Sequence, residues 1–243
     1  ELHKKGFEPL MPGIKHGVFN DIKGLENLIS EKTAAVIIEP VQGEAGVYSA
    51  TQEFMDKLRS LTSIHGALLI VDEVQSGVGR MGSLYGYMHY EIEPDILTSA
   101  KGLGGGMPIG ATLTTRSIGE SMQPGTHGST FGGNPMACAV ADTVLTVVSD
   151  KEFLDEVLRK EKLFVKLLNE LNEEKSVFSA IRSEGLWIGC DLINEESSKV
   201  IDRCYDNGLI LVSAGSNCLR LAPALNINDD DIKEGIEILK QVF

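Results

Sequence analysis

The sequence has few basic residues, and none of its apolar runs approaches the length of a membrane span. Its 22 Lys and Arg stand against 35 Asp and Glu, which gives a formal net charge of −13. Such an acidic surface argues against nucleic acid and against anionic membranes as partners. An anionic substrate would therefore need an arginine placed at its own binding site.

Paired cysteines and metal-type spacings are also absent. The cysteines form no C-x-x-C pair, so we expect free thiols in a cytoplasmic protein: Cys138, Cys190, Cys204 and Cys218. The histidines show no metal spacing, and we predict no metal site: His3, His16, His65, His89 and His127. Residues 1–6 contain neither an initiator methionine nor the apolar core of a signal peptide, which we interpret as a fragment or a processed product.

The first half of the chain alternates apolar runs with helical patterns. Residues 34–39 and 67–72 are continuous apolar runs that end in acids, a pattern typical of parallel strands buried on both faces. Between them Thr51 can cap a helix, and another helix is expected after Asp21. Strand, helix and strand in this order predict an α/β fold. Its chemistry would gather where the strands end, and Asp72 lies at such an end.

Helical patterns also dominate the middle and the end of the chain. Pro135 begins a predicted helix that runs through Val148. A second helix is expected to open at Ser149, with Glu152 as its capping-box partner. Asp229 is the expected cap of a last helix.

A change of pattern after residue 148 predicts two domains. Residues 186–192 and 218–221 read as strands that follow the long helical region. We therefore expect a larger α/β domain over residues 1–148 and a smaller α/β domain over residues 149–243, within a chain of 243 residues.

Lys101 and Asp72 form the most informative pair in the sequence. Lys101 stands in a glycine-crowded run over residues 99–106, where a backbone without side chains can approach a planar ligand. A lone lysine of this kind is ordinarily a surface residue, and a strand-end acid often only caps a turn. The run also fails the dinucleotide pattern because Met107 stands where glycine or alanine is required. A lysine that forms an imine and an acid that holds a pyridine nitrogen together predict pyridoxal phosphate (PLP).

Five segments extend this pattern over nearly the whole chain: Glu39–Val47, Val71–Arg80, Ser99–Lys101, His127–Pro135 and Arg220–Pro223. With them the chain resembles the class III, ω-amino-acid type of PLP-dependent aminotransferases. The resemblance implies the aspartate-aminotransferase-like fold, also called fold type I of PLP-dependent transferases. It has a large domain with a mostly parallel sheet and a smaller C-terminal α/β domain.

The same resemblance implies roles around the cofactor. Lys101 resembles the Schiff-base lysine, whose freed amine moves a proton between substrate and cofactor. Asp72 resembles the partner of the protonated ring nitrogen, and Glu73 belongs to the same implied cofactor-binding set. Val74 resembles the residue packed on the ring face, and Gln75 the residue that reaches the ring hydroxyl.

Substrate binding and assembly are implied as well. Thr130 resembles the hydroxyl that reaches the phosphate of a neighbouring subunit's cofactor, and Ser129 resembles a substrate contact, which implies a homodimer with shared active sites. Without the family, a turn before the Pro135 helix is the favoured reading of both. Arg220 resembles the arginine that binds the α-carboxylate of glutamate and 2-oxoglutarate. Glu44 resembles the acid that pairs with this arginine when an amine-bearing substrate is bound.

Within the family, the chain is most similar to acetylornithine aminotransferases of arginine biosynthesis. Three segments carry this similarity: residues 19–22, 39–47 and 217–223. The implied reaction moves the δ-amino group of N2-acetyl-L-ornithine to 2-oxoglutarate in ping-pong half reactions. Ornithine or 4-aminobutyrate aminotransferase, a PLP isomerase or racemase, and an inactive fragment that acts only as a subunit remain alternatives. The N-terminal region of family members, with its phosphate cup, has no counterpart here. We therefore expect weak cofactor binding and little turnover from this polypeptide alone.

Overall fold

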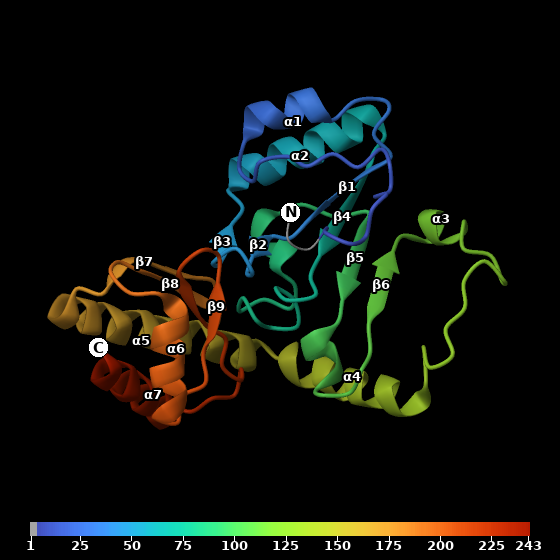
Figure 1. Cartoon of the computed structure of the whole chain (residues 1–243). Helices are drawn as coiled ribbons and strands as arrows, with labels where there is room; N and C mark the ends of the chain where they lie inside the picture. The colour runs from blue at the N-terminus through green and yellow to red at the C-terminus, as the bar shows by residue number, and fades with distance from the viewer. Residues whose placement is uncertain (1–3) are drawn as a thin grey trace.

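The computed structural model describes residues 4–243, so the expectations for His3 and for the start of the chain lie outside the described residues. Two separate four-stranded sheets organise the chain, one in each half (Figure 1). In spatial order the strands of the first sheet are β1 (Ala35–Ile38), β4 (Leu68–Asp72), β5 (Ile96–Ser99) and β6 (Ala111–Thr114). The first three are parallel and β6 is antiparallel, so the predicted mostly parallel sheet is confirmed.

Two helices cover one face of this sheet, α1 (Ile22–Leu28) and α2 (Gln52–His65) (Figure 1). Asp21 and Thr51 cap them, as predicted. Their apolar sides enclose a core with the buried residues of β4: Leu25, Ile29, Phe54, Met55, Leu58, Leu61, Leu69 and Val71. The expected burial of both faces is wrong for β1, where Ile37 is 65% exposed. β1 is an edge strand, and among the described residues these helices pack on the face opposite Ile37.

Short elements connect the strands of the first half. They are the hairpin β2 (Val41–Gln42) and β3 (Tyr48–Ser49), the 3-10 turns η1 (Gly86–Tyr90) and η2 (Lys101–Gly104), and α3 (Arg116–Gly119). After α3 the chain makes an extended excursion at the edge of the molecule before it enters α4 (Pro135–Val148), whose bounds are as predicted (Figure 1).

The second sheet has the order β7 (Phe178–Ser183), β8 (Ile188–Leu192), β10 (Cys218–Leu221) and β9 (Val212–Ala214), all antiparallel. Its helices are α5 (Lys151–Lys175), α6 (Ser197–Asp206) and α7 (Asp229–Val242). One core runs through these elements, from Val157 of α5 to Leu239 of α7. Phe153 and Leu225 also pack against Val148 of α4, and a domain boundary near Ser149 stays a prediction. No helix among the described residues is long and apolar enough to cross a membrane.

Two predicted helix caps are wrong by one residue. Ser149 ends α4, and Asp150 caps α5 by accepting hydrogen bonds from the amides of Glu152 and Phe153. α7 is capped by Asn228, whereas Asp229 is its first helical residue. In both cases two adjacent side chains suit an N-cap, and the carboxylate or amide that reaches the free amides of the first turn takes the position.

Candidate active site

Three charged residues lie at or just after the carboxyl ends of adjacent parallel strands. Ile38 of β1 is paired with Val71 of β4, so the next residues along the chain, Glu39 and Asp72, stand at the same sheet edge. Lys101 begins η2 directly after β5. Burial and the Asp72 charge raise the pKa of Glu39, whereas Lys101 acts in the opposite direction. These charges therefore share one electrostatic environment. The sequence pattern marks the acid that ends each apolar run, but it predicts no role for Glu39.

Asp72 is held by one of its two carboxylate oxygens. Oδ1 accepts hydrogen bonds from the Val74 amide at 3.0 Å and from Thr98 Oγ1 at 3.1 Å. Oδ2 has no partner within residues 4–243. A fixed carboxylate with one free oxygen is suited to bind a cationic N–H group.

Lys101 is exposed and has an unusual backbone conformation. Its φ is +48°, in the left-handed region that few residues other than glycine adopt. Such a conformation costs about 1–3 kcal/mol, and the surrounding structure must enforce it. Val78, a β-branched residue near the same site, has φ +54°. Lys101 Nζ makes no hydrogen bond or ion pair with any residue that the structure describes. Its amine is therefore free to react.

A cavity of about 670 Å³ opens beside Lys101. Its wall includes Lys101, Val74 and Gln75, three of the residues predicted at the cofactor, together with Arg80. Asp72 lies outside this wall, two residues before Val74. The free amine of Lys101 suits the aldehyde of PLP, and the free carboxylate oxygen of Asp72 suits its protonated ring nitrogen.

Glu73 points away from the cavity. It is fully buried, and its Oε2 accepts from Ser76 Oγ at 2.6 Å and from the Gly86 amide at 2.9 Å. Its Oε1 accepts from the Tyr87 amide at 2.6 Å. Burial raises the pKa of this carboxyl, and the three hydrogen bonds oppose that rise. The bonds from Gly86 and Tyr87 tie the loop after β4 to η1, so Glu73 holds this loop in place.

Glu44 connects Gln75 with Arg220. Its Oε1 accepts from Arg220 Nη1 at 2.7 Å and from Gln75 Nε2 at 3.0 Å. The hydrogen bond from Arg220, followed by that from Gln75, holds the pKa of Glu44 below its usual value. The Arg220 side chain is only 13% exposed, whereas that of Glu44 is 67% exposed. The acid is thus the partner in contact with solvent, and the arginine is the more enclosed one.

The hairpin that carries Glu44 rests on the second sheet. Arg182 of β7 donates two hydrogen bonds of 2.6 Å to Asp191, and its Nε donates to the Gly46 carbonyl at 2.9 Å. Its guanidinium also lies 4.1 Å from the centre of the Tyr48 ring. Gly43 packs on Trp187 so closely that a Cβ would overlap the indole. The second half of the chain therefore fixes the position of the hairpin.

Ser129 and Thr130 lie apart from the Lys101 cavity. Both are exposed, and Ser129 lines a second cavity of about 310 Å³ with residues 108–110 and 131–134. Ser129 Oγ accepts from the Gly132 amide at 2.9 Å, and this bond closes a local turn before the Pro135 helix. Within one chain the structure does not bring these hydroxyls to Lys101.

The remaining polar groups give no metal site among the described residues. No group of three or more His, Cys, Asp or Glu side chains within residues 4–243 is arranged to hold an ion. The four cysteines are free thiols, and burial raises the pKa of Cys190, of Cys204 and of Cys218, the last to about 11.

Known proteins are similar to this chain in sequence and in fold. The Aminotransferase class-III family matches residues 3–243. A succinylornithine transaminase of Yersinia pestis bv. Antiqua (strain Angola) is 48% identical over 237 residues, which are 96% of this chain and 57% of that protein. The chain thus spans little more than half the length of such curated relatives.

Solved structures of related enzymes superpose closely. The N-acetylornithine aminotransferase of Stenotrophomonas maltophilia K279a gives a TM-score of 0.86 at 36% identity, over 95% of this chain and 64% of that one. An ornithine aminotransferase of Toxoplasma gondii, described with partial occupancy of PLP at its active site, gives 0.89 at 32% identity, over 98% and 57% of the two chains. The expected fold type I is thereby confirmed, and the chain belongs to the class III aminotransferases, a family of PLP-dependent transaminases.

Proposed function

We propose that this chain carries the lysine and the substrate-binding arginine of a PLP-dependent aminotransferase for the δ-amino group of an N2-acylated ornithine. N2-acetyl-L-ornithine, in arginine biosynthesis, is the donor that the sequence favours, and 2-oxoglutarate is the acceptor. The observation that carries the proposal is the Glu44–Arg220 ion pair at 2.7 Å, held through Gln75 to the wall of the Lys101 cavity.

The ion pair explains how one site could accept two kinds of substrate. A donor that presents a terminal amine leaves Arg220 paired with Glu44. A 2-oxoglutarate molecule brings a carboxylate that matches the guanidinium fork, and the exposed Glu44 side chain can move aside. The substrate's own charge would then decide the state of the pair.

Lys101 and Asp72 provide the proton chemistry in this proposal. PLP, when bound, supplies an electrophilic carbonyl and a ring that accepts electrons. Asp72 Oδ2 would hold the ring nitrogen in its protonated form, and its fixed Oδ1 would keep that oxygen aimed. The unpaired amine of Lys101 would take the proton from the reacting carbon of the substrate and deliver it to the cofactor.

We also propose a homodimer in the cytoplasm, with Thr130 of one copy at the phosphate of the other. Thr130 is exposed and distant from the Lys101 cavity of its own chain, and Phe131 next to it is 81% exposed. Four free thiols favour a reducing compartment. Mass measurement by light scattering of the chain with and without PLP tests the dimer.

Borohydride reduction in the presence of PLP tests the central proposal, because it makes the link between a lysine and the cofactor permanent. Peptide mass mapping should find the label at Lys101, and it should disappear in Lys101→Ala while persisting in Lys166→Ala, a change on the exposed side of α5. Label scattered over surface lysines would contradict the assignment. A need for 2-oxoglutarate in turnover separates transamination from isomerisation.

A further inference from the structure

Arg80 lies where the two halves of the chain meet. Its Nη1 donates to the carbonyl of Leu186 and to the carbonyl of Pro223, each at 2.7 Å. No carboxylate pairs with it among the residues that the structure describes, and burial lowers its pKa to about 10. A buried guanidinium that is satisfied by backbone carbonyls acts as a bridge between the segments that own them.

The backbone around Arg80 is packed against the second half just as closely. The Arg80 carbonyl accepts from the Leu186 amide at 3.0 Å. A Cβ on Gly185 would collide with that carbonyl, and a Cβ on Gly82 would press into Leu158 of α5. The two halves are closely packed here, so the backbone position of Arg80 is fixed.

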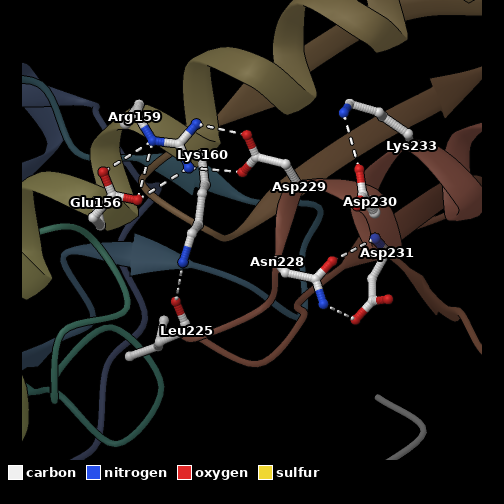
Figure 2. A network of polar contacts seen from close by, with 9 residues as sticks. All are labelled: Glu156, Arg159, Lys160, Leu225, Asn228, Asp229, Asp230, Asp231 and Lys233. Atoms are coloured by element: carbon white, nitrogen blue, oxygen red, sulfur yellow. Dashed lines mark hydrogen bonds and ion pairs between the residues drawn. The ribbon is translucent and has the colours of Figure 1, made fainter.

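The segment held by Arg80 directly follows Arg220. After β10 ends at Leu221, Ala222 and residues 224–226 form part of the wall of the Lys101 cavity. Lys160 of α5, which is also buried, donates to the Leu225 carbonyl at 3.4 Å (Figure 2). Arg80 and Lys160 thus hold the carbonyls of Pro223 and Leu225 from two different parts of the chain.

The loop after β4 therefore reaches Arg220 along two routes. Gln75 holds the side chain of Arg220 through Glu44. Arg80, five residues after Gln75, holds the backbone that follows Arg220 through the Pro223 carbonyl. The first route is exposed and can open, because Glu44 is largely in solvent. The second is buried and contains no group that a substrate would displace.

We propose that Arg80 is a positioning residue, which sets the place of Arg220 relative to Lys101 by holding the Pro223 carbonyl. The inference rests on the proposed function of Arg220 as the carboxylate-binding residue. Without the bridge, residues 222–226 lose their hold on the cofactor loop, and the end of β10 shifts with them. The carboxylate fork is then misplaced while the lysine itself is not.

Three substitutions of the full chain test this role: Arg80→Met, Arg80→Gln and Arg80→Lys. We expect Arg80→Met to weaken 2-oxoglutarate binding, measured by calorimetry, roughly tenfold, because two charge-assisted hydrogen bonds are lost. Borohydride labelling of Lys101 by PLP should stay within about twofold of wild type. Arg80→Lys should recover most of the affinity, since its ammonium can donate to both carbonyls. Arg203→Met, which removes a surface pair with Glu195, is the matched control.

Hydrogen exchange gives a readout that needs no ligand. The amide of Ile227, which donates to the Ala224 carbonyl at 3.0 Å, should exchange faster in Arg80→Met and Arg80→Gln, and those of β7 should not. If Arg80→Met does not fold, Arg80→Gln is judged by the same criteria. Wild-type exchange and wild-type affinity in a folded variant would overturn the proposal, as would equal losses of affinity and of Lys101 labelling. A wild-type chain without Lys101 labelling would contradict the proposed function instead, and exchange would still decide whether Arg80 holds the segment.

Discussion

Glu44 and Arg220 are 176 residues apart in the sequence, yet their side chains form a 2.7 Å ion pair beside the Lys101 cavity. The partners differ in exposure, because the side chain of the arginine is 13% exposed and that of the acid 67%. Removing the acid should therefore free the arginine without displacing it.

Glu44→Ala should bind 2-oxoglutarate more tightly and shift substrate preference toward α-amino acids. The gain should be roughly two- to fivefold, the size expected for losing a competing exposed ion pair. Calorimetry measures the affinity, and Glu26→Ala, which removes another exposed acid in an ion pair, is the control. An unchanged preference would count against Glu44 as the gate.

The same ion pair predicts a dependence of stability on pH. The pKa of Glu44 is lowered from 4.5 by the hydrogen bonds from Arg220 and Gln75. For an acid with a lowered folded-state pKa, the stabilisation is present above the unfolded value and is lost as the pH falls through the folded value. At neutral pH the free energy of unfolding of wild type should exceed that of Glu44→Gln by at most about 1 kcal/mol, since the pair is exposed. Urea titrations should show that difference vanishing in acid; a difference that grows in acid would contradict the assignment.

Glu73→Gln should destabilise the fold, although the change is nearly isosteric. Both oxygens of Glu73 accept backbone N–H groups, so either orientation of the amide places an NH₂ against an N–H. The expected loss is about 1–3 kcal/mol in urea denaturation. Glu31→Gln, in an exposed turn, should be neutral. Equal midpoints for the two variants would rule out the anchoring role.

Gly43→Ala should displace the hairpin that carries Glu44. The added methyl would overlap the Trp187 indole, which is almost fully buried. Overpacking of this kind costs about 1–3 kcal/mol. The fluorescence of Trp187, the single tryptophan of the chain, reports the change directly. Gly128→Ala, where nothing lies within 4 Å of the added atom, is the matched control and should leave the spectrum as it is.

Local signals in the sequence predicted the local structure well. The bounds of α4 follow from Pro135 and the apolar run after it, and Thr51 caps α2 as its side chain suggests. Errors arose where two neighbouring polar residues compete for one cap, as with Ser149 and Asp150. The contacts of Arg80 could not be predicted, because its acceptors are backbone carbonyls, which every residue possesses.

In the candidate site, too, some positions could be predicted from the sequence and others could not. Val74, Gln75 and Lys101 meet at one cavity because they follow adjacent parallel strands, whose order the βαβ pattern indicates. The inward turn of Glu73 depends on η1, which is itself placed by the packing of Tyr90 and Ile92 on α2. No periodicity within residues 71–80 contains that information.

The support that Arg182 gives to the Gly46 carbonyl bridges 136 residues of sequence and has a consequence for synthesis on the ribosome. The hairpin leaves the exit tunnel long before β7 does. It therefore lacks the contact with Arg182 while α4 and α5 are still being made. Closure over such a distance also makes assembly slow. A ribosome stalled after α4 would therefore present a nascent chain whose first sheet can pair while Glu44 has no fixed position.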